Sequence, residues 1–339
     1  MAGFNVAIVG VTGMVGQTFI KVLQERGFPV KGWKMLASAR SSDKKVVVGG
    51  QQYGIEEARP ESFAGVDFAF FSAGGDISEA LAPEAVKQGA IVVDNSSAFR
   101  MDPQVPLVVP EVNPDAAHRH QGLIANPNCS TIQMVVALQP LHQAAGLKRV
   151  VVSTYQSVSG AGKEAVDEVK MQSEAILAGR EFLKERIPYK GASRHHQIAF
   201  NMVPHIDIFE EDDYTKEEMK MIRETRKIME LPALPITATT VRVPVLNGHC
   251  ESVNVELNNG LSPQQARRLF EDFPGVVVMD DPEAMLYPMP VFADGKDEVF
   301  VGRIRYDRSV PYGLNMWVVA DNIRKGAATN SIQIAELLI

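Results

Sequence analysis

The chain has few of the features that assign a protein to a specialised class. Its 339 residues include only two cysteines, too few for a disulfide framework or a cysteine-rich zinc site. The formal net charge is -7 and no basic run is present, which argues against nucleic-acid binding. No apolar run approaches the roughly 20 residues that cross a bilayer, and no leader pattern precedes the first expected strand. We therefore expect a cytoplasmic protein with no metal site, no nucleic-acid partner and no membrane partner.

The residues that are present have the balance of a globular protein. Hydrophobic residues make up 45% of the chain and charged residues 22%. A length of 339 residues is enough for two domains that each have a core. Function must therefore be inferred from local motifs.

A glycine-rich turn lies close to the N-terminus. Residues 6–9 form an apolar strand, residues 10–16 read Gly-Val-Thr-Gly-Met-Val-Gly, and a helical pattern follows. This order is the context of a dinucleotide-binding turn, in which backbone N–H groups and a helix N-terminus meet a pyrophosphate. The alternative is a tight turn that only packs the helix on the strand. The expected cofactor contacts are Gly10, Thr12, Gly13, Met14 and Val15.

The end of the second expected strand, 33–37, indicates which dinucleotide binds. NAD sites usually carry Asp or Glu at this point, but this chain has Ser38, Arg40 and Ser41. A guanidinium and two hydroxyls suit a 2′-phosphate, so the segment predicts NADP rather than NAD. The alternative is an exposed polar turn.

Alternating strands and helices over the first 125 or so residues predict a doubly wound parallel sheet. Ligands bind at the carboxyl ends of such strands, which adds Ser72, Ala73, Gly74 and Asn95 as expected cofactor contacts. From residue 148 strands are interleaved with a few helices, which indicates an α+β domain with a mixed or antiparallel sheet. We expect a cofactor domain of residues 1–128 and 325–339, whose closing helix packs back on it, and a catalytic domain of residues 129–324.

Cys129 stands where an apolar strand, 122–125, turns into a helical pattern, 130–145. A helix N-terminus favours a thiolate, so the position suits a nucleophile. The alternative is a small buried core thiol. Cys250 follows His249 within an expected strand and has no helix N-terminus beside it.

Taken together, several segments resemble the aspartate-β-semialdehyde dehydrogenase family over nearly the whole chain. The matching segments are 10–16, 38–41, 94–103, 126–131, 156–162, 217–220, 242–249 and 320–326. The resemblance implies reversible reductive dephosphorylation of β-aspartyl phosphate by NADPH, which gives aspartate semialdehyde, NADP and phosphate. It also implies a place in lysine or diaminopimelate, threonine, methionine and isoleucine biosynthesis, and a homodimer that can form tetramers.

The resemblance also implies roles for individual residues. Cys129 would attack the acyl phosphate, His249 would act as acid and base, and Gln156 would orient the acyl group. The implied substrate-binding residues are Arg242 for the carboxylate, Glu217 for the ammonium, and Lys220, Arg100 and Asn128 for the phosphate. Further implied cofactor contacts are Ser159, Gly160 and Asn322.

Other interpretations stay open. A related acyl-phosphate reductase, of the N-acetyl-glutamyl-phosphate or glyceraldehyde-phosphate type, has the same architecture. A catalytically silent NADP-binding regulator is a third possibility. Glu217 and Lys220, three apart on an expected helix, could simply be a solvated ion pair. Asp76 and the pair Asn247 and Gly248 depart from the family pattern.

Overall fold

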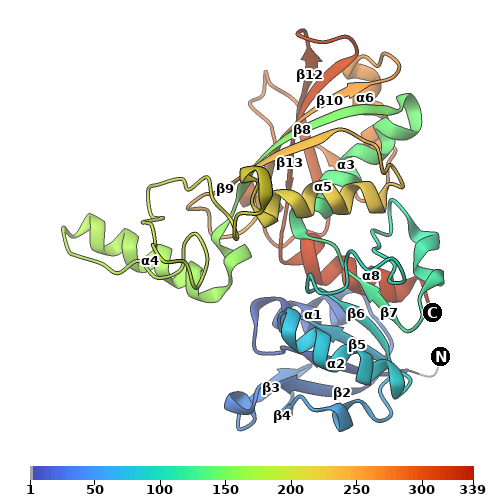
Figure 1. Ribbon diagram of the computed structural model, residues 1–339, viewed down its shortest axis with the longest axis vertical. Helices are drawn as coiled ribbons and strands as arrows, with labels where there is room; N and C mark the ends of the chain where they lie inside the picture. The colour runs from blue at the N-terminus through green and yellow to red at the C-terminus, as the bar shows by residue number, and fades with distance from the viewer. Residues whose placement is uncertain (1–2) are drawn as a thin grey trace. The chain divides into compact units, whose positions relative to one another are not determined.

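The computed structural model describes residues 3–339, except for the side chain of Glu211. The chain divides into two compact units, Met1–Asn128 with Ala327–Ile339, and Cys129–Gly326. Figure 1 colours the chain from its N-terminus to its C-terminus, and each unit contains one sheet. The fold is therefore α/β with two sheets, and the units are described separately below.

The first unit is a seven-stranded sheet with helices on both faces. Its strands are β1 (Phe4–Val9), β2 (Val30–Ala37), β3 (Lys45–Val48), β4 (Gln51–Glu57), β5 (Phe68–Phe71), β6 (Ile91–Asp94) and β7 (Leu123–Ala125). Its helices are α1 (Met14–Glu25), α2 (Gly75–Lys87), α8 (Thr329–Glu336) and the short η1 (Ala39–Ser41), η2 (Pro60–Phe63) and η3 (Pro114–Arg119). A π-helix, η6 (Arg324–Ala328), leads into α8.

Alternating side chains of β1 build the two cores of this unit. Val6 and Ile8 belong to a cluster that includes residues of α1 and α8, whereas Ala7 and Val9 belong to a cluster that includes residues of α2. Because successive residues of a strand point to opposite faces, α1 and α8 cover one face and α2 covers the other. The sheet is thus doubly wound.

The glycine-rich turn allows α1 to begin directly at the end of β1. Gly10 has a φ of 86°, and a Cβ there would lie 2.3 Å from the carbonyl oxygen of Ser72. A Cβ on Gly16 would lie 2.3 Å from the carbonyl oxygen of Gly10. The first and third glycines therefore close the turn and pack the helix on the strand. A Cβ on Gly13 would meet its nearest atom, the Gly10 carbonyl oxygen, only at 3.3 Å, and Gly13 lines a cavity.

The second unit is built on a six-stranded sheet. Its strands are β8 (Leu147–Gln156), β9 (Ile236–Arg242), β10 (His249–Leu257), β11 (Val276–Val278), β12 (Val299–Asp307) and β13 (Gly313–Ala320). Its helices are α3 (Cys129–Ala145), α4 (Lys163–Leu177), α5 (Lys216–Ile228), α6 (Pro263–Glu271), α7 (Pro290–Ala293), η4 (Val158–Ala161) and η5 (Glu211–Asp213). The order β11-β12-β13-β10-β8-β9 places β10 and β8 in the middle.

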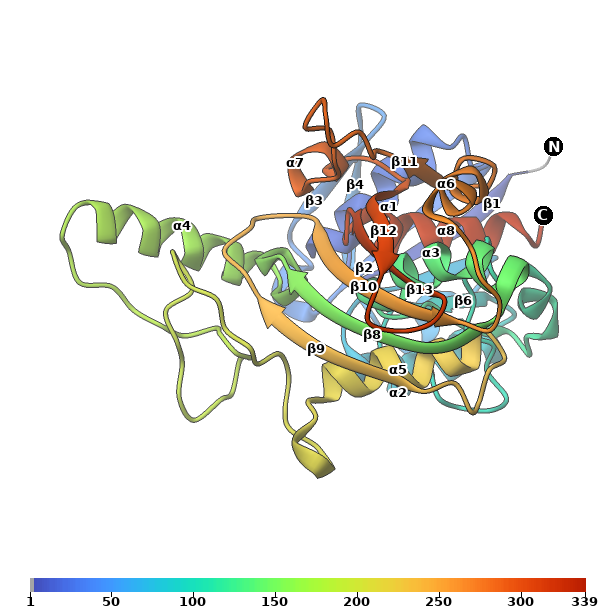
Figure 2. The ribbon, with the colours of Figure 1, turned by 90° about the horizontal axis from the view of Figure 1, so that it is seen from above.

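One face of this sheet carries α3, which begins at Cys129, and α5, which holds Glu217 and Lys220. α3 packs on β10 and β13, α5 packs on β9, and the two helices contact each other. α3 is buried along nearly its whole length, with Ile132, Val135 and Leu138 in the interior. α4 and the segment after it extend away from the sheet, as Figure 2 shows.

The predicted architecture is confirmed, with differences in detail. The first sheet is parallel except at its edge, where β3 pairs antiparallel with β4, and the sequence analysis missed both of these strands. The second sheet is mixed, because β8 pairs parallel with β9 and β11 with β12, while the remaining pairs are antiparallel. The closing helix is shorter than expected, and α8 packs on α1 and β6 within the first unit.

Candidate active site

The first unit contains a cavity of about 570 Å³ at the glycine-rich turn. Its walls come from the ends of β1, β2, β4 and β5, the first residues of η1 and the start of α2. The lining residues are Val9, Gly10, Thr12, Gly13, Ala37, Ser38, Ala39, Arg40, Glu57, Ala58, Ser72, Ala73, Ile77 and Leu81. Ile77 and Leu81 add an apolar wall, which suits the flat face of a purine.

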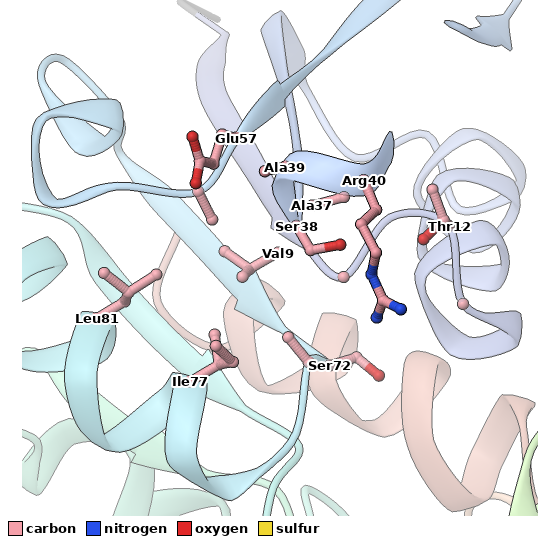
Figure 3. Close-up of a pocket in the computed structure, with 14 residues that line it drawn as sticks. Val9, Thr12, Ala37, Ser38, Ala39, Arg40, Glu57, Ser72, Ile77 and Leu81 are labelled. Atoms are coloured by element: carbon pink, nitrogen blue, oxygen red, sulfur yellow. The ribbon is translucent and has the colours of Figure 1, made fainter. Parts of the chain in front are cut away.

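Two charged side chains line this cavity. Figure 3 shows the Arg40 guanidinium extending into the space between Thr12 and Ser72, with Glu57 on the opposite side. The segment after β2 holds no carboxylate, but the parallel pairing of Ala37 with Glu57 brings one in from β4, where it also forms an ion pair with Arg59. The absence of a carboxylate from residues 38–41 therefore does not leave the cavity without one.

About half of the expected cofactor contacts line the cavity. Those that line it are Gly10, Thr12, Gly13, Ser38, Arg40, Ser72 and Ala73. Those outside its lining are Met14, Val15, Ser41, Gly74 and Asn95 in the first unit, and Ser159, Gly160 and Asn322 in the second. Glu57, Ala58, Ile77 and Leu81 were missed, since nothing in their local sequence marks them.

In the second unit, Cys129 is the first residue of α3 and is half-buried. A Cβ on Gly326 would lie 2.8 Å from the Cβ of Cys129, so a glycine at position 326 leaves room for the cysteine. The thiol therefore lies at the positive end of a buried 17-residue helix.

His249 is the first residue of β10 and is fully buried. The backbone N–H of Ser157 donates to its Nδ1 at 3.1 Å, so Nδ1 is an acceptor and the ring proton lies on Nε2. Nε2 has no hydrogen-bond partner among the described residues. Burial, with Arg242 as a second cause, lowers the pKa of His249 to about 3, so the ring is neutral near pH 7. The structure thus presents a neutral imidazole with an available N–H.

Arg242 ends β9 and is 4% exposed. Its Nη1 donates to the carbonyl oxygen of Ser157 at 2.7 Å, while its Nε has no partner among the residues that the structure describes. Burial lowers the pKa of Arg242, and the charges of Glu217 and Cys129 oppose this shift. A Cβ on Gly160 would lie 2.9 Å from Nη1 and 3.2 Å from Nε2 of His249, so Gly160 covers both groups. The guanidinium is a buried cation with a donor available to an anion.

Gln156 links the end of β8 to α5. It lies opposite Arg242 in the sheet, and its Nε2 donates to Oε1 of Glu217 at 3.2 Å. The other oxygen of Glu217 lies 3.2 Å from Nζ of Lys220, which also contacts Asp207 at 2.8 Å. The Glu217 and Lys220 side chains are 8% and 20% exposed, so this is a largely buried pair and not a solvated one.

Hydrogen bonds with Asn322 hold residues 157–160, the segment that lies against His249. Oδ1 of Asn322 accepts hydrogen bonds from the Ser157 hydroxyl at 3.0 Å and the Gly248 N–H at 2.9 Å, and its Nδ2 donates to the Ser159 hydroxyl at 3.0 Å. Asn247, a departure from the family pattern, accepts from Ser159 at 3.0 Å. Ser157 was missed by the sequence analysis, although it sits between two residues that were expected in the site.

Two of the expected substrate residues belong to the first unit. Nε of Arg100 donates to the carbonyl oxygen of Asn126 and its Nη2 to that of Asn95, both at 2.9 Å. Arg100 therefore ties the segment after β6 to the segment after β7. Asn128 is buried and directly precedes Cys129 in the chain.

The remaining thiol and the remaining candidate sites have a different character. Cys250 is buried in β10, where burial, followed by the charge of Glu251, raises its pKa to about 12. Within residues 3–339, no cluster of three or more His, Cys, Asp or Glu side chains is arranged to hold a metal ion. In the same part of the chain, every helix is too short or too polar to cross a membrane.

Two family models match the chain, one for each part. Residues 5–120 match the semialdehyde dehydrogenase NAD binding domain, and residues 138–325 match the semialdehyde dehydrogenase dimerisation domain. Together with the doubly wound sheet and its cavity, these matches define an oxidoreductase with a nicotinamide dinucleotide cofactor.

Known relatives narrow the class. The aspartate-semialdehyde dehydrogenase of Aquifex aeolicus is 56% identical over 99% of this chain and 98% of the relative, and that of Bacillus subtilis is 55% identical over 99% and 97%. A crystal structure of aspartate semialdehyde dehydrogenase II from Vibrio cholerae complexed with ASA superimposes with a TM-score of 0.94 at 47% identity, covering 100% of this chain and 98% of that one. The chain belongs to the aspartate-semialdehyde dehydrogenase family.

A more distant relative has been crystallised with NADP. Aspartate semialdehyde dehydrogenase with NADP from Candida albicans superimposes with a TM-score of 0.75 at 25% identity, over 99% of this chain and 98% of that one. The two-unit architecture is therefore shared by bacterial and fungal members of the family.

Proposed function

We propose that the chain catalyses the reversible reductive dephosphorylation of β-aspartyl phosphate to aspartate semialdehyde, with NADPH as the reductant. The observation that carries this proposal is the cluster at the start of α3. There the Cys129 thiol interacts electrostatically with the buried Arg242 guanidinium, which lies with a neutral His249 beneath Gly160. A nucleophile, a cation and a proton donor are the groups that acyl transfer needs.

The chemistry divides into two steps on Cys129. Its sulfur forms a bond to the acyl carbon of the substrate, and the phosphate leaves with the electron pair of the broken C–O bond. A bound nicotinamide dinucleotide supplies hydride chemistry for reduction of the resulting thioester. The Nε2–H of the neutral His249 donates a hydrogen bond to the carbonyl oxygen of the thioester as that oxygen gains negative charge. The C–S bond then breaks with its electron pair on sulfur, which returns Cys129 to the thiolate and releases the aldehyde.

Substrate recognition follows from charge. The buried Nε of Arg242, which has no partner in the described part of the chain, suits the α-carboxylate. Glu217 offers a carboxylate to the α-ammonium, and Gln156, which contacts Glu217, suits the carbonyl under attack. Lys220, Arg100 and Asn128 are proposed to hold the phosphate.

The cavity of the first unit supports NADP as the cofactor. Arg40 and the hydroxyls of Ser38 and Thr12 line it, and they offer donors to a 2′-phosphate. On this basis we assign residues 1–128 and 325–339 to NADP binding and residues 129–324 to catalysis and dimerisation. The Candida albicans structure with NADP supports the same choice.

Pathway and assembly follow from the family. Aspartate semialdehyde would supply lysine or diaminopimelate, threonine, methionine and isoleucine biosynthesis in the cytoplasm. The matched dimerisation domain supports a homodimer, which can associate to a tetramer. Exposed apolar side chains on α4 and the segment after it, such as Leu177, Phe200 and Met202, are suited to burial between two copies.

Phosphate-dependent reduction of NADP is the test of the proposed function. Purified protein should reduce NADP with aspartate semialdehyde only when phosphate is added. N-acetyl-glutamate semialdehyde and glyceraldehyde 3-phosphate should react at least about 100-fold more slowly, because the largely buried Glu217 would lack an ammonium partner. A preference for either alternative aldehyde would assign the chain to that reductase, and binding of NADP without turnover would indicate a regulator.

A further inference from the structure

Two buried polar side chains, Gln133 and Glu251, lie close in sequence to Cys129 and His249 but have no role in the proposed reaction. Gln133 comes one turn after Cys129 on α3, and Glu251 comes two residues after His249 on β10. Residues four apart on a helix share a face, as do residues two apart on a strand. Because α3 packs on β10, Gln133 and Glu251 lie between the same two elements as Cys129 and His249.

One hydrogen bond already joins the helix to the strand at this level. Gln133 is fully buried, and its Nε2 donates to the carbonyl oxygen of His249 at 3.4 Å. Its Oε1 and both carboxyl oxygens of Glu251 are also buried, and among the described residues no partner meets hydrogen-bonding geometry with them. A buried polar atom without a hydrogen-bond partner costs free energy of folding, so a hydrogen bond between Gln133 and Glu251 would stabilise the folded chain.

Protonation of Glu251 would complete the connection. Burial raises the pKa of Glu251 well above its ordinary value, and the neighbouring Gln133 amide opposes this shift only in part. The residues opposite Glu251 on the adjacent strands, Thr154 and Val318, carry no charge. A neutral carboxyl group has one O–H, which can donate to Oε1 of Gln133. Glu251, Gln133 and the carbonyl of His249 then form one chain of hydrogen bonds.

We propose that Gln133 and Glu251 are a positioning pair that fixes the first turn of α3, and with it Cys129, against the start of β10, which carries His249. Neither residue touches the substrate in this proposal, which rests on the catalytic roles proposed for Cys129 and His249. A displacement of about 1 Å between reacting groups can lower the rate about 100-fold. Loss of a buried hydrogen bond one turn from the thiol could therefore lower the rate without any contact to the substrate.

Two substitutions at position 251 separate positioning from simple packing. Glu251→Leu retains volume and removes both polar atoms, whereas Glu251→Gln retains a neutral donor and acceptor. We expect Glu251→Leu to lower kcat by about 10- to 100-fold with KM for aspartate semialdehyde within about twofold. Labelling of Cys129 by limiting iodoacetamide should slow by about tenfold, since the thiol moves away from Arg242. Glu251→Gln should restore both rates to within about threefold of wild type.

Two further variants test the link from the helix side and control for packing. Gln133→Met keeps the length of the side chain but breaks the link, so it should resemble Glu251→Leu. Val253→Ala removes buried volume at the next inward position of β10, and it should lower stability while leaving kcat and the labelling rate near wild type.

The outcomes are distinct. Folded Glu251→Leu with wild-type kcat and labelling would overturn the proposal, and so would Glu251→Gln that is as slow as Glu251→Leu. If Glu251→Leu and Gln133→Met both fail to fold, the pair is structural and the proposal is also wrong. Absence of dehydrogenase activity in the wild-type chain would remove the proposed function, while the Cys129 labelling rates would still report on the link.

Discussion

At the scale of single residues, we predict that Arg40 sets the preference for NADP over NAD. Its guanidinium extends into the cavity, with Glu57 opposite (Figure 3). Arg40→Ala should weaken NADP binding by about 10- to 100-fold, because a charge-assisted hydrogen bond contributes about 1.5–3 kcal/mol. NAD binding should stay nearly unchanged, and Lys45→Ala, an exposed change outside the cavity, should affect neither. Fluorescence titration with both cofactors is the measurement, and equal losses would show that Arg40 is structural.

Catalysis should depend on the planar shape of the Arg242 guanidinium as well as on its charge. Arg242→Lys keeps a cation but loses the planar fork and the donor at Nε, so kcat/KM should fall by at least about 100-fold with the fold intact. Arg268→Lys, an exposed change on α6, should have no effect. Steady-state kinetics and circular dichroism measure the two properties. Near wild-type kinetics for Arg242→Lys would exclude it from the site.

At the scale of elements, two substitutions in the β1–α1 turn should distinguish glycines that pack the helix from a glycine that contacts the cofactor. Gly16→Ala would place a Cβ 2.3 Å from a backbone oxygen, so it should cost about 1–3 kcal/mol of stability. Gly13→Ala meets its nearest atom at 3.3 Å with φ at −78°, so the protein should fold normally. It should still bind NADP more weakly, because the methyl group enters the cavity where a pyrophosphate approaches. Thermal melts and titrations of both variants test this, and equal behaviour would contradict it.

The same scale shows which elements could be predicted from the sequence. The strand β1 and the helix α3 were expected close to their observed bounds. β3 and β4 were missed although Gly49 and Gly50 mark a hairpin turn between them. α6 was missed although Ser262, Pro263 and Gln265 form a capping signal at its start. Those two signals were present and were not used.

Other features depend on long-range packing, and the local sequence does not show them. Glu57 reaches the cavity only because β4 pairs with β2. Gln133 looks like any polar residue in a helix, and Glu251 looks like an outward residue in a strand. Their burial follows from α3 lying on β10, which periodicity does not reveal. The neutral state of His249 likewise depends on its burial and on the charge of Arg242. Arg242 lies on another strand, so its effect on His249 arises only when the sheet has formed.

At the scale of the whole molecule, His249 should make stability depend on pH. Its pKa is about 3 when folded and about 6.5 when unfolded, so between these values the unfolded chain binds one more proton. Stability therefore rises with pH through this window and is lost as pH falls. His249→Gln removes this contribution, so its stability relative to wild type should increase below about pH 6.5, by at most about 1.4 kcal/mol per pH unit.

Thermal melts across this window measure the difference. Gln143→Ala, an exposed change on α3 that removes no titrating group, should run parallel to wild type at every pH. Parallel curves for His249→Gln as well would show that His249 titrates normally in the folded protein. That result would also remove the argument that the imidazole is neutral when substrate binds.

The reactivity of the two thiols tests the central role of Cys129 most directly. Cys129 is half-buried at the start of α3 and interacts electrostatically with Arg242, whereas Cys250 is buried with its pKa raised to about 12. Limiting iodoacetamide at neutral pH, followed by mass spectrometry, should find label on Cys129 first, with activity lost in step and phosphate protecting it. Cys129→Ala should bind NADPH without turnover, while Cys250→Ser stays active. Label on Cys250 first, or an active Cys129→Ala enzyme, would contradict a covalent role for Cys129.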